Sequence, residues 1–530
     1  MLRSKGIHLY LVLILLAVYL VNGIIAIPQN SVTYDEMDHW SYGKRILKLQ
    51  PEKIYAYDDA SAMPVSGLNA IPRAVEQIVN PGLRKTDAGF SDIMNGRYVT
   101  LVICLLTGMF IYKWSKYLFG KKAGLFSLFL FVFCPNLNAH ATLLTTDAYA
   151  ALFTVSTFYL FWRFVKKSGW KNFLLFSISI GLSQLVKPSL LHLFIILFFV
   201  SLILLVKRKT LFSGWKRNLL RALVMAGIVV LIINTGFFFK GIGTPLSFFD
   251  LKSETFVSLQ SSFVKNIPLP FPAPYIEGLD MTMYMNRLGA GHIHVSGKNY
   301  LLGELKTGKG FWNYYFVVAF FKTPFSVLIA LLAVPVLLIL RRSKVRHSGA
   351  MMFLGFTVLY FLTFFGLFNN SQVGLRHVLM IYPLVYVALG SVMTTQIPDM
   401  YRYLSIPFFA ILTGYAIFTY YRFYPNLISY HNELVRSKNV YRIMADSNVD
   451  YGQSVFRYER FRKLHPELKV PGSTPEAGRF ILSIDVYVGV NDKYDTGWLN
   501  KNFKPSAHFD HCYLIFDISE NELRQKGLKQ

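Results

Sequence analysis

The chain has 530 residues, of which 53% are hydrophobic and only 16% are charged, and its formal net charge is +26. Soluble domains contain about 25% charged residues, and an aqueous core cannot hide so many apolar side chains. The composition therefore excludes a disordered chain and an ordinary cytosolic protein, and it predicts a polytopic membrane protein. The three cysteines, Cys104, Cys134 and Cys512, give neither a disulfide framework nor the spacing of a zinc site.

The chain begins with basic residues and continues into an apolar run from Ile7 to Ile27. This run is longer than the about 7–15 residues of a signal-peptide core, and no small-residue cleavage site follows it. We expect the run to be retained as the first transmembrane helix and to act as a signal anchor.

Eleven apolar segments predict about eleven transmembrane helices. They lie at residues 7–27, 98–112, 123–134, 148–162, 172–186, 189–206, 222–239, 316–340, 350–368, 378–395 and 404–421. The third, fourth and fifth are shorter than the about 17–25 residues of a full crossing. We expect these three either to extend into flanking polar residues or to stop short of the far surface.

The charged residues orient these helices. With the N-terminus in the cytoplasm, the cytoplasmic segments contain 21 basic residues and one acid, Asp399, in agreement with the positive-inside rule. The basic residues are Arg3, Lys5, Lys113, Lys116, Lys121, Lys122, Arg163, Lys166, Lys167, Lys171, Lys207, Arg208, Lys209, Lys216, Arg217, Arg221, Arg341, Arg342, Lys344, Arg346 and Arg402. They account for most of the net charge, so the charge gives no support for nucleic-acid binding.

This orientation places three longer segments outside the membrane. Residues 28–97 and 240–315 are outer loops of a transmembrane domain that spans residues 1–421, and residues 422–530 form an extracytoplasmic C-terminal domain. Two runs in this tail predict strands, an alternating run from Phe480 to Val488 and a run from Cys512 to Phe516. We therefore expect a small α/β domain at the C-terminal end.

The first outer loop begins with a cluster of charged residues, Asp35, Glu36, Asp38 and His39. If the loop is helical here, Asp35, Asp38 and His39 share one face, and Glu36 points elsewhere. Clustered carboxylates at a membrane surface suit a general base, a divalent metal or both. They also suit an ordinary helix start, where acids stabilise the positive end of the helix dipole.

A second outer loop contains His140 and the run Thr145-Thr146-Asp147 at the start of the fourth apolar segment. Thr146 or Asp147 is well placed to be a simple N-cap. Asp147 nevertheless returns to the same membrane face as Asp35. Two separate loops that each offer an acid at one face are more informative than either acid alone.

Several basic or histidine side chains are predicted to lie at the outer membrane face, where the positive-inside rule disfavours basic residues. Lys187, before a proline between the fifth and sixth segments, suits a lipid phosphate, and snorkelling to the headgroups is the alternative. Arg376 and His377 precede the tenth segment and suit a phosphate or pyrophosphate. Lys322 opens the eighth segment, and His292 forms a weak His-x-His metal signal with His294.

Acids and bases therefore meet at the outer membrane face. A carboxylate can activate a hydroxyl group, and Lys and Arg can neutralise a leaving phosphate. Sequence motifs of nucleotide-binding loops, dinucleotide-binding folds, zinc peptidases and serine hydrolases are absent. With no nucleotide outside the membrane, the pattern indicates group transfer from a lipid-borne phosphate donor.

Taken in chain order, these residues resemble the motifs of the GT-C superfamily of membrane glycosyltransferases, and within it the protein O-mannosyltransferase-like and aminoarabinose-transferase-like family. The resemblance extends over residues 33–453. It rests on Asp35-Glu36-x-x-His39-x-x-Tyr42-Gly43, His140-x-x-x-x-Thr145-Thr146-Asp147, Lys187-Pro188, Gly291-His292 through Gly303-Glu304, Trp312-x-Tyr-Tyr315 with Lys322-Thr-Pro324, Gly374-Leu-Arg376-His377 through Tyr382-Pro383, and Asp446-Ser447-Asn448-x-Asp450-Tyr451-Gly452-Gln453. The chain departs from the family at Tyr451, where the family usually has Trp, and after His377, where a proline often follows.

The resemblance implies a GT-C fold and an inverting transfer of a sugar from a polyprenyl-phosphate donor to an acceptor hydroxyl at the outer face of the cell (inner or plasma) membrane. The acceptor classes are protein, a glycolipid such as lipid A, and envelope glycan. The resemblance implies Asp35 as the general base or a metal support, with Glu36 as its neighbour, and Asp147 as the acid of the second loop. It leaves open whether a divalent cation, Mg or Mn, bridges Asp35, Asp147 and the phosphate.

The resemblance assigns binding of the donor phosphate to Lys187 and Arg376, and His377 matches a motif position beside them. The remaining candidates match motif positions without an assigned role. They are His39, Tyr42, His140, His292, Lys322, Asp446, Asn448 and Asp450.

Three other classes of function compete with this interpretation. A flippase or transporter of lipid-linked sugars favours charged residues deep within the spans and inverted repeats, whereas the acids here lie in loops. A surface-polysaccharide polymerase or ligase with a pyrophosphate-linked donor shares the outer basic residues but lacks the paired acid motifs. A non-catalytic membrane scaffold remains if Asp35 and Asp147 serve only as helix caps.

Overall fold

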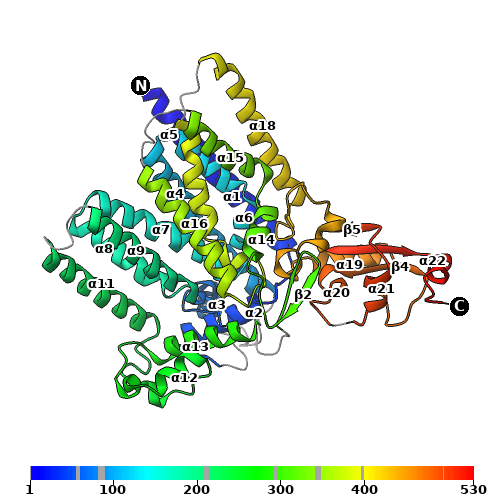
Figure 1. Cartoon of the computed structure of the whole chain (residues 1–530), viewed down its shortest axis with the longest axis horizontal. Helices are drawn as coiled ribbons and strands as arrows, with labels where there is room; N and C mark the ends of the chain where they lie inside the picture. Colours follow the sequence, from blue (N-terminus) through cyan, green and yellow to red (C-terminus); the bar gives the residue numbers. More distant parts are fainter. Residues whose placement is uncertain are drawn as a thin grey trace.

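The computed structural model describes residues 2–54, 60–80, 90–207, 214–289, 297–340, 348–394, 399–492 and 494–529. A large bundle of helices forms one region, and a smaller region at the C-terminal end contains a β-sheet and extends away from the bundle (Figure 1).

Each of the eleven predicted apolar segments overlaps a helix of the bundle. These helices are α1 (Leu2–Ala26), α4 (Phe90–Phe119), α5 (Lys121–Val132), α7 (Asp147–Lys166), α8 (Trp170–Ser183), α9 (His192–Lys207), α11 (Trp215–Gly236), α15 (Phe325–Leu340), α16 (Ser348–Phe368), α17 (Ile381–Leu389) and α18 (Asp399–Phe423). Large hydrophobic side chains such as Ile7, Phe198 and Leu332 are well exposed on them. Such helices need an apolar solvent, so the chain is a multi-pass membrane protein.

Within the described residues, six helices are long and apolar enough to cross a membrane alone, and two bent helix pairs raise this number to as many as eight. This number covers the described residues alone, so the expectation of about eleven spans, three of them short, stays a prediction. The predicted segment 148–162 belongs to the 20-residue helix α7, which is long enough to cross a membrane. The predicted segment 172–186 overlaps α8, which has only 14 residues. The polar flanks lengthen the first of these helices and not the second.

Both bends occur at a proline. Helix α5 turns by 63° into α6 (Pro135–Ala141), and α14 (Tyr314–Lys322) turns by 107° into α15 after Pro324. Proline lacks the N–H that a continuing helix needs, and it disfavours a helical conformation in the residue before it. The predicted segment 316–340 is therefore a broken helix, with Lys322 at the break.

Shorter elements cover the end of the bundle that faces away from the N-terminus. They are α2 (Glu36–Leu47), α3 (Ser66–Val79), α12 (Glu254–Gln260), α13 (Ala273–Leu288) and the antiparallel pair β1 (Lys298–Leu301) and β2 (Glu304–Thr307). Short 3₁₀ helices occur between the other elements along the chain: η1 (Ile27–Gln29), η2 (Pro188–Leu191), η3 (Leu246–Phe248), η4 (Phe263–Asn266), η5 (Leu375–Val378), η6 (Gly390–Thr394), η7 (Ser437–Arg442) and η8 (Asp446–Asn448).

The C-terminal region contains a four-stranded sheet. The strands β3 (Leu468–Lys469), β4 (Gly478–Ser483), β6 (Tyr513–Ile518) and β5 (Ala507–Phe509) lie in the order β3-β4-β6-β5, with β3 parallel to β4 and the other pairs antiparallel. Four helices accompany it: α19 (Val455–Leu464), α20 (Ile484–Tyr487), α21 (Gly497–Asn502) and α22 (Glu520–Gln525).

The alternating run from Phe480 to Val488 was predicted as one strand, and this prediction is wrong in its second half. The strand β4 ends at Ser483, and the hydroxyl of Ser483 accepts a hydrogen bond from the Val486 amide at the start of α20. A serine cap of this kind favours a helix over further extension. The run from Cys512 to Phe516 lies almost entirely in β6, as predicted.

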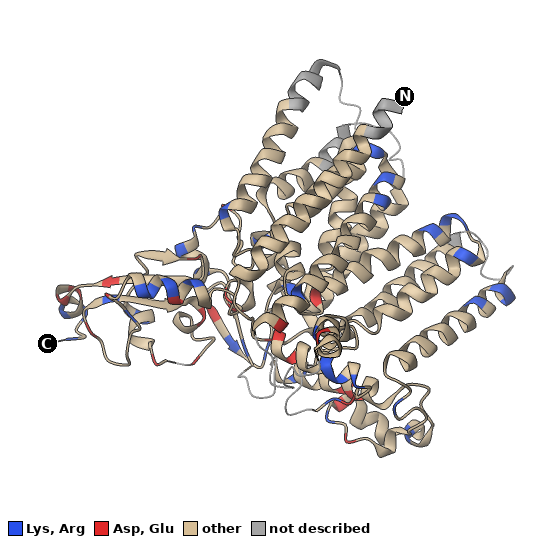
Figure 2. Ribbon diagram, turned by 180° about the vertical axis from the view of Figure 1, so that it is seen from behind, with Lys and Arg blue, Asp and Glu red and all other residues tan. Residues whose placement is uncertain are grey.

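The charged side chains are distributed unevenly between the two ends of the bundle. Lys and Arg occupy the ends of the long helices near the N-terminus, whereas the Asp and Glu residues gather at the opposite helix ends and in the C-terminal region (Figure 2). The predicted catalytic acids belong to the second group.

Helix α4 lies at the centre of the bundle, in contact with α1, α3, α5, α7 and α17. The side-chain amide of Asn69 on α3 donates to the Gly96 carbonyl and the Thr100 hydroxyl of α4, both at 2.7 Å. On its other side, α3 packs against α2, where Gly43 faces the backbone of Ser66. This stack fixes α2, and therefore the cluster at its start, against the bundle.

Substitution of Gly43 with alanine tests this packing. A Cβ at residue 43 would lie 2.3 Å from the backbone oxygen of Ser66, so the two helices must separate. We expect Gly43→Ala to lower the free energy of unfolding by about 1–3 kcal/mol, measured by thermal unfolding in detergent. Gly227→Ala is the control, because a Cβ there meets nothing within 4 Å. Equal stability of both variants would contradict the close packing of α2 on α3.

Candidate functional site

A cavity of about 540 Å³ lies where the outer loops meet the helices. Its charged and ring-nitrogen side chains include Asp35, Lys187, Arg376 and His377, all four of which the sequence singled out. The remainder of its wall is mainly apolar and includes Leu191, Ile195, Phe364, Phe365 and Phe368. The cavity therefore combines a charged end with an apolar wall, which is formed by η2 and the helices α9 and α16.

Asp35 and Arg376 form an ion pair within this cavity, although 341 positions separate them in the chain. Arg376 lies in η5, and its Nη1 donates both to Asp35 Oδ2 and to the hydroxyl of Tyr451. The guanidinium group also lies 4.7 Å from the centre of the Tyr451 ring, a cation–π contact. Burial opposes the charged form, but Asp35 and Tyr451 raise the pKa of Arg376 well above its ordinary value.

One donor of Arg376 has no protein partner. Its Nε is buried and makes no hydrogen bond with any residue that the structure describes. A buried N–H that is left unpaired costs roughly 1–3 kcal/mol. A ligand oxygen in the cavity would remove this cost, and the permanently charged guanidinium selects an anion.

Asp147 and Lys187 form a second ion pair, with 2.5 Å between Lys187 Nζ and Asp147 Oδ1. Asp147 also accepts a hydrogen bond from the Thr145 hydroxyl at 3.3 Å, and its Oδ2 lies 3.9 Å from His140 Nδ1. Lys187 directly precedes η2 and lines the cavity. The structure thus brings each predicted acid beside a predicted phosphate-binding residue.

Neither acid serves its helix as a cap. Asp35 occupies the N-cap position of α2, but its side chain accepts no capping hydrogen bond. Helix α7 begins at Asp147, its N-cap residue is Thr146, and no side-chain capping hydrogen bond is present there either. The carboxylates of Asp35 and Asp147 turn instead toward Arg376 and Lys187. The scaffold hypothesis requires both acids to be simple caps, and this geometry weighs against it.

His377 presents a hydrogen-bond donor to the cavity. The Asn369 side-chain oxygen accepts from the Ser371 amide at 3.2 Å, which orients the Asn369 amide nitrogen toward His377 Nδ1 at 3.1 Å. His377 Nδ1 therefore accepts, and the proton of the neutral ring is assigned to Nε2. Burial, followed by the charges of Lys187 and Arg376, lowers the pKa of His377 well below 6.5, which keeps the ring neutral.

Glu36 does not line the cavity, in contrast to its neighbour Asp35. It is fully buried and accepts two hydrogen bonds from Arg97, from Nε at 2.7 Å and from Nη2 at 2.5 Å. The backbone amides of Thr33 and Leu144 also donate to it, each at 2.8 Å. Burial alone would raise the pKa of Glu36, but Arg97 lowers it below its ordinary value. This geometry gives Glu36 a structural role.

Several predicted residues hold the frame around the cavity. Lys322 donates to the backbone oxygens of Ile428 and Asn448 at 2.5 and 2.7 Å. The side-chain oxygen of Asn448 accepts from the Leu375 amide at 2.9 Å, directly before Arg376. Lys322 and Asn448 therefore connect the last motif to η5 and position the arginine.

The aromatic and histidine candidates of the first loop are buried in packing contacts. The Tyr42 hydroxyl donates to the Pro51 carbonyl at 2.9 Å. The His39 ring nitrogens lie 3.5 and 3.4 Å from the hydroxyls of Ser61 and Ser66. Like His39 and Tyr42, His140 does not line the cavity, although it approaches Asp147. The candidate His292 lies outside the described residues.

Asp446 and Asp450 gather near a third acid, Asp485, which the sequence analysis did not single out. The amide of Asp446 donates to Asp485 Oδ1 at 2.7 Å, and the amide of Gly452 donates to Asp450 Oδ1 at 3.0 Å. Burial, together with neighbouring carboxylates, raises the pKa of Asp446 and of Asp450 to about 6. These acids shape the loop that carries Tyr451, which contacts Arg376 directly.

The residues proposed to hold a divalent cation do not fit one as they are arranged here. Asp35 and Asp147 each already face a cationic side chain, Arg376 and Lys187. Among the residues that the structure describes, no three His, Cys, Asp or Glu side chains form a group that could hold a metal ion. A hard divalent cation prefers several oxygen ligands, so we derive no step through one.

Comparison with known families matches residues 88–233 to the family of dolichyl-phosphate-mannose-protein mannosyltransferases. Over these residues the match confirms the resemblance to protein O-mannosyltransferase-like enzymes. No curated protein matches the sequence.

Two kinds of solved structure resemble the chain at low identity. ArnT from Cupriavidus metallidurans, in a crystal structure bound to undecaprenyl phosphate, is 11% identical with a TM-score of 0.48, over 96% of this chain and 98% of that one. The Archaeoglobus fulgidus oligosaccharyltransferase is 13% identical with a TM-score of 0.44, over 77% of this chain and 56% of that one.

The buried pair of Glu36 and Arg97 predicts a large effect on stability. Arg97→Gln leaves a buried carboxylate without its counter-charge, which costs about 3–5 kcal/mol, and we expect a correspondingly lower unfolding temperature in detergent. Arg479→Gln is the matched control, because its partner Glu467 and Arg479 itself are both well exposed. It should cost no more than about 1 kcal/mol. An Arg97→Gln protein as stable as the control would refute the structural role of the pair.

Proposed function

We propose that the protein is an inverting glycosyltransferase that moves a sugar from a polyprenyl-phosphate donor to an acceptor hydroxyl at the outer face of the membrane. The observation that carries the proposal is the cavity, in which a cluster of anion-binding donors adjoins an apolar wall. A lipid phosphate has these two properties in one molecule. The match of residues 88–233 to the dolichyl-phosphate-mannose-protein mannosyltransferases, a family named for a lipid-phosphate-linked sugar, supports the same donor chemistry.

The donor binds with its lipid against the apolar wall and its phosphate at the charged end. Lys187 Nζ, the unpaired Nε of Arg376 and the protonated Nε2 of His377 supply the hydrogen bonds. Together they neutralise the negative charge that grows on the phosphate oxygen as the bond to the sugar breaks. Asp147 orients Lys187, because the two side chains are in contact at 2.5 Å.

Asp35 is the general base. Its partner Arg376 favours the ionised carboxylate, and the donor phosphate competes for that guanidinium, which leaves a carboxylate oxygen available. Asp35 then takes the proton of the acceptor hydroxyl as the hydroxyl oxygen bonds to the anomeric carbon. The bond between this carbon and the phosphate oxygen breaks on the opposite side. The configuration inverts, and polyprenyl phosphate leaves with both bonding electrons.

The active site faces away from the cytoplasm in this proposal. Lys and Arg mark the helix ends near the N-terminus as cytoplasmic, and the cavity lies among the loops at the opposite ends (Figure 2). The protein is then a multi-pass protein of the cell (inner or plasma) membrane. Its acceptor is a protein, a glycolipid or an envelope glycan.

A surface-polysaccharide polymerase or ligase is the second candidate function. The unpaired Arg376 Nε and the adjacent Lys187 suit a pyrophosphate as well as a phosphate. A donor panel that includes both kinds of lipid-linked sugar separates the two functions.

Release of free polyprenyl phosphate from a panel of polyprenyl-phosphate sugars tests the proposed reaction. Loss of a general base slows a reaction by about 10²–10⁴-fold, so we expect the Asp35→Asn enzyme in nanodiscs to lose at least about 99% of the wild-type rate. Asp250→Asn makes the same chemical change at an exposed residue of an outer loop and should retain the full rate.

Thermal unfolding of both variants shows whether they remain folded. A folded Asp35→Asn protein with the wild-type rate would remove Asp35 from the chemistry. Pyrophosphate-linked sugars are assayed in parallel, and release of polyprenyl pyrophosphate from them alone would favour the polymerase or ligase. No release from any donor would favour a transporter.

The ion pairs at the charged end also predict the response to chelation. Because cationic side chains already neutralise Asp35 and Asp147, we expect the rate of polyprenyl-phosphate release to be unchanged after EDTA treatment and dialysis. A loss of rate that Mg²⁺ or Mn²⁺ restores, and that Ca²⁺-saturated EDTA does not cause, would show that a divalent cation takes part.

A further inference from the structure

A second cavity, of about 460 Å³, lies between the end of α18 and the C-terminal sheet. Its lining comes from three elements: Arg422 in the last turn of α18, Arg436 to Lys438 at the start of η7, and Ala507 and His508 in β5. It shares no lining residue with the larger cavity. We propose that this second cavity binds the phosphate group of an anionic phospholipid from the outer leaflet.

The cavity concentrates positive charge without compensation. Arg422, Arg436 and Lys438 are basic, and no acid lines the cavity. Within the part of the chain that the structure describes, none of these three side chains has an ion-pair partner, although other basic residues nearby, such as Arg457 with Asp510, are paired. Three unpaired cations around one cavity repel one another unless an anion lies between them.

The floor of the cavity is held by a network of neutral groups. Ser437 is buried, and its hydroxyl lies 2.8 Å from His511 Nδ1 and 3.1 Å from His431 Nε2. His431 Nδ1 donates in turn to the Ser429 carbonyl at 3.0 Å. Burial lowers the pKa of His431 to about 3 and that of His511 to about 4, so these rings stay neutral at pH 7. The network therefore supplies rigidity, and the arginines and the lysine supply the charge.

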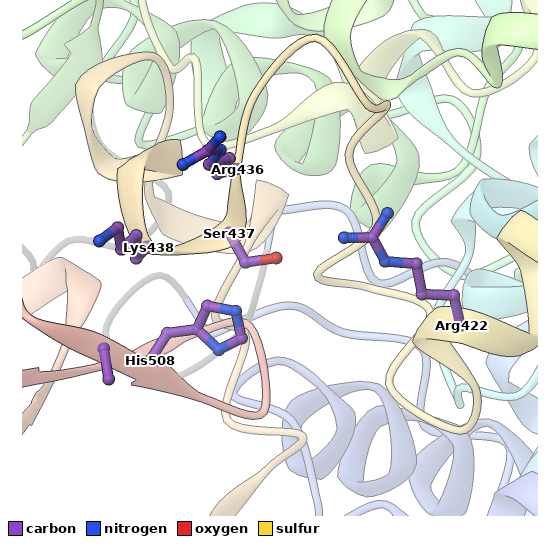
Figure 3. Close-up of a pocket in the computed structure, with 6 residues that line it drawn as sticks. Arg422, Arg436, Ser437, Lys438 and His508 are labelled. Carbon is purple, nitrogen blue, oxygen red and sulfur yellow. The ribbon is translucent and has the colours of Figure 1, made fainter.

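The side chains converge in a way that suits an anion. The guanidinium group of Arg422, the hydroxyl of Ser437 and the ring of His508 lie around a common space, and Arg436 and Lys438 line the cavity on the far side of Ser437 from Arg422 (Figure 3). A phosphate oxygen in this space can accept from the planar N–H groups of Arg422. The remaining two basic residues then add longer-range attraction.

The position of Arg422 indicates that the phosphate belongs to a lipid. Ile411 and Phe418, which are 72% and 61% exposed, precede Arg422 at intervals that place all three on one face of α18. Tyr421 and Tyr424 lie at the same end of the helix, as is typical of aromatic residues at a membrane surface. An acyl chain that lies against Ile411 and Phe418 brings its headgroup to Arg422.

Binding of phosphatidylglycerol measured without any sugar donor tests this site apart from the proposed reaction. The full-length protein in detergent is titrated with short-chain phosphatidylglycerol, with the matching phosphatidylcholine and with inorganic phosphate. Each basic residue near a membrane surface contributes about a fivefold change in affinity for anionic lipid. We expect the triple variant Arg422→Gln, Arg436→Gln, Lys438→Gln to bind phosphatidylglycerol about a hundredfold more weakly than the wild type.

Two further variants keep the test specific. Arg460→Gln removes one exposed charge from α19, outside the cavity, and should bind like the wild type. Arg422→Lys keeps the charge but not the planar pair of N–H donors. It should bind phosphatidylglycerol more weakly than the wild type and more tightly than the single variant Arg422→Gln, which is measured beside it. Size-exclusion profiles and unfolding temperatures show whether each variant is folded.

The relative affinities for the three ligands distinguish a lipid site from a site for free phosphate and from the absence of a site. Tight binding of phosphatidylglycerol alone, lost in the folded triple variant, supports the lipid site. Comparable binding of inorganic phosphate, lost in the same variant, shows a phosphate site that takes a free ion, and it overturns the assignment to a lipid. Equal binding of phosphatidylcholine, or equal affinities of the triple variant and Arg460→Gln, overturns the site altogether.

Discussion

The buried ion pair between Glu36 and Arg97 is the contact on which the outer face of the molecule depends. Arg97 rises from the central helix α4 and also donates to the backbone oxygens of Ile27, Asn30 and Ser31, which join α1 to α2. Glu36 accepts in return from the Leu144 amide, in the loop that leads to Asp147. One pair of side chains therefore holds both loops that carry Asp35 and Asp147, the acids proposed to act in catalysis. Its desolvation is repaid because nearly every donor and acceptor in the pair has a partner.

The charged end of the main cavity follows from this frame. Asp35 precedes Glu36 directly, so fixing Glu36 in the interior turns the neighbouring carboxylate toward Arg376. The two ion pairs at this end line or adjoin the cavity, whereas Glu36 and Arg97 are fully buried and do not. An arriving phosphate can replace a carboxylate as the partner of a cation without leaving a buried charge alone. In the proposed function, this exchange is how the site accepts the donor phosphate.

The C-terminal part of the chain is joined to the membrane region at several points. Asn448 positions η5, Tyr451 contacts Arg376, and Lys322 at the helix break binds the backbone of both Ile428 and Asn448. The loop after α18 thus supports Arg376 in the main cavity from behind, while Arg422 at the end of the same helix lines the second cavity. The two cavities have no lining residue in common, but the segment that follows α18 contacts Arg376 of the first and contributes Arg436 to Lys438 to the second.

The sequence by itself determined the membrane character and the approximate positions of the helices, because hydropathy is a local signal. From the positive-inside rule and from misplaced charges it also predicted the sidedness and the candidates Asp35, Asp147, Lys187 and Arg376. Only the tertiary structure decided which charges pair. Asp35 pairs with Arg376, which lies 341 positions away in the chain, whereas the neighbouring Glu36 is buried and pairs with Arg97. In the sequence, Arg97 is marked only by its position at the outer end of the apolar segment 98–112, and this position does not identify Glu36 as its partner. Likewise, Ser483 ended a strand that alternation alone would have continued. Pairing and burial are properties of residues brought together from distant parts of the chain, and no local pattern contains them.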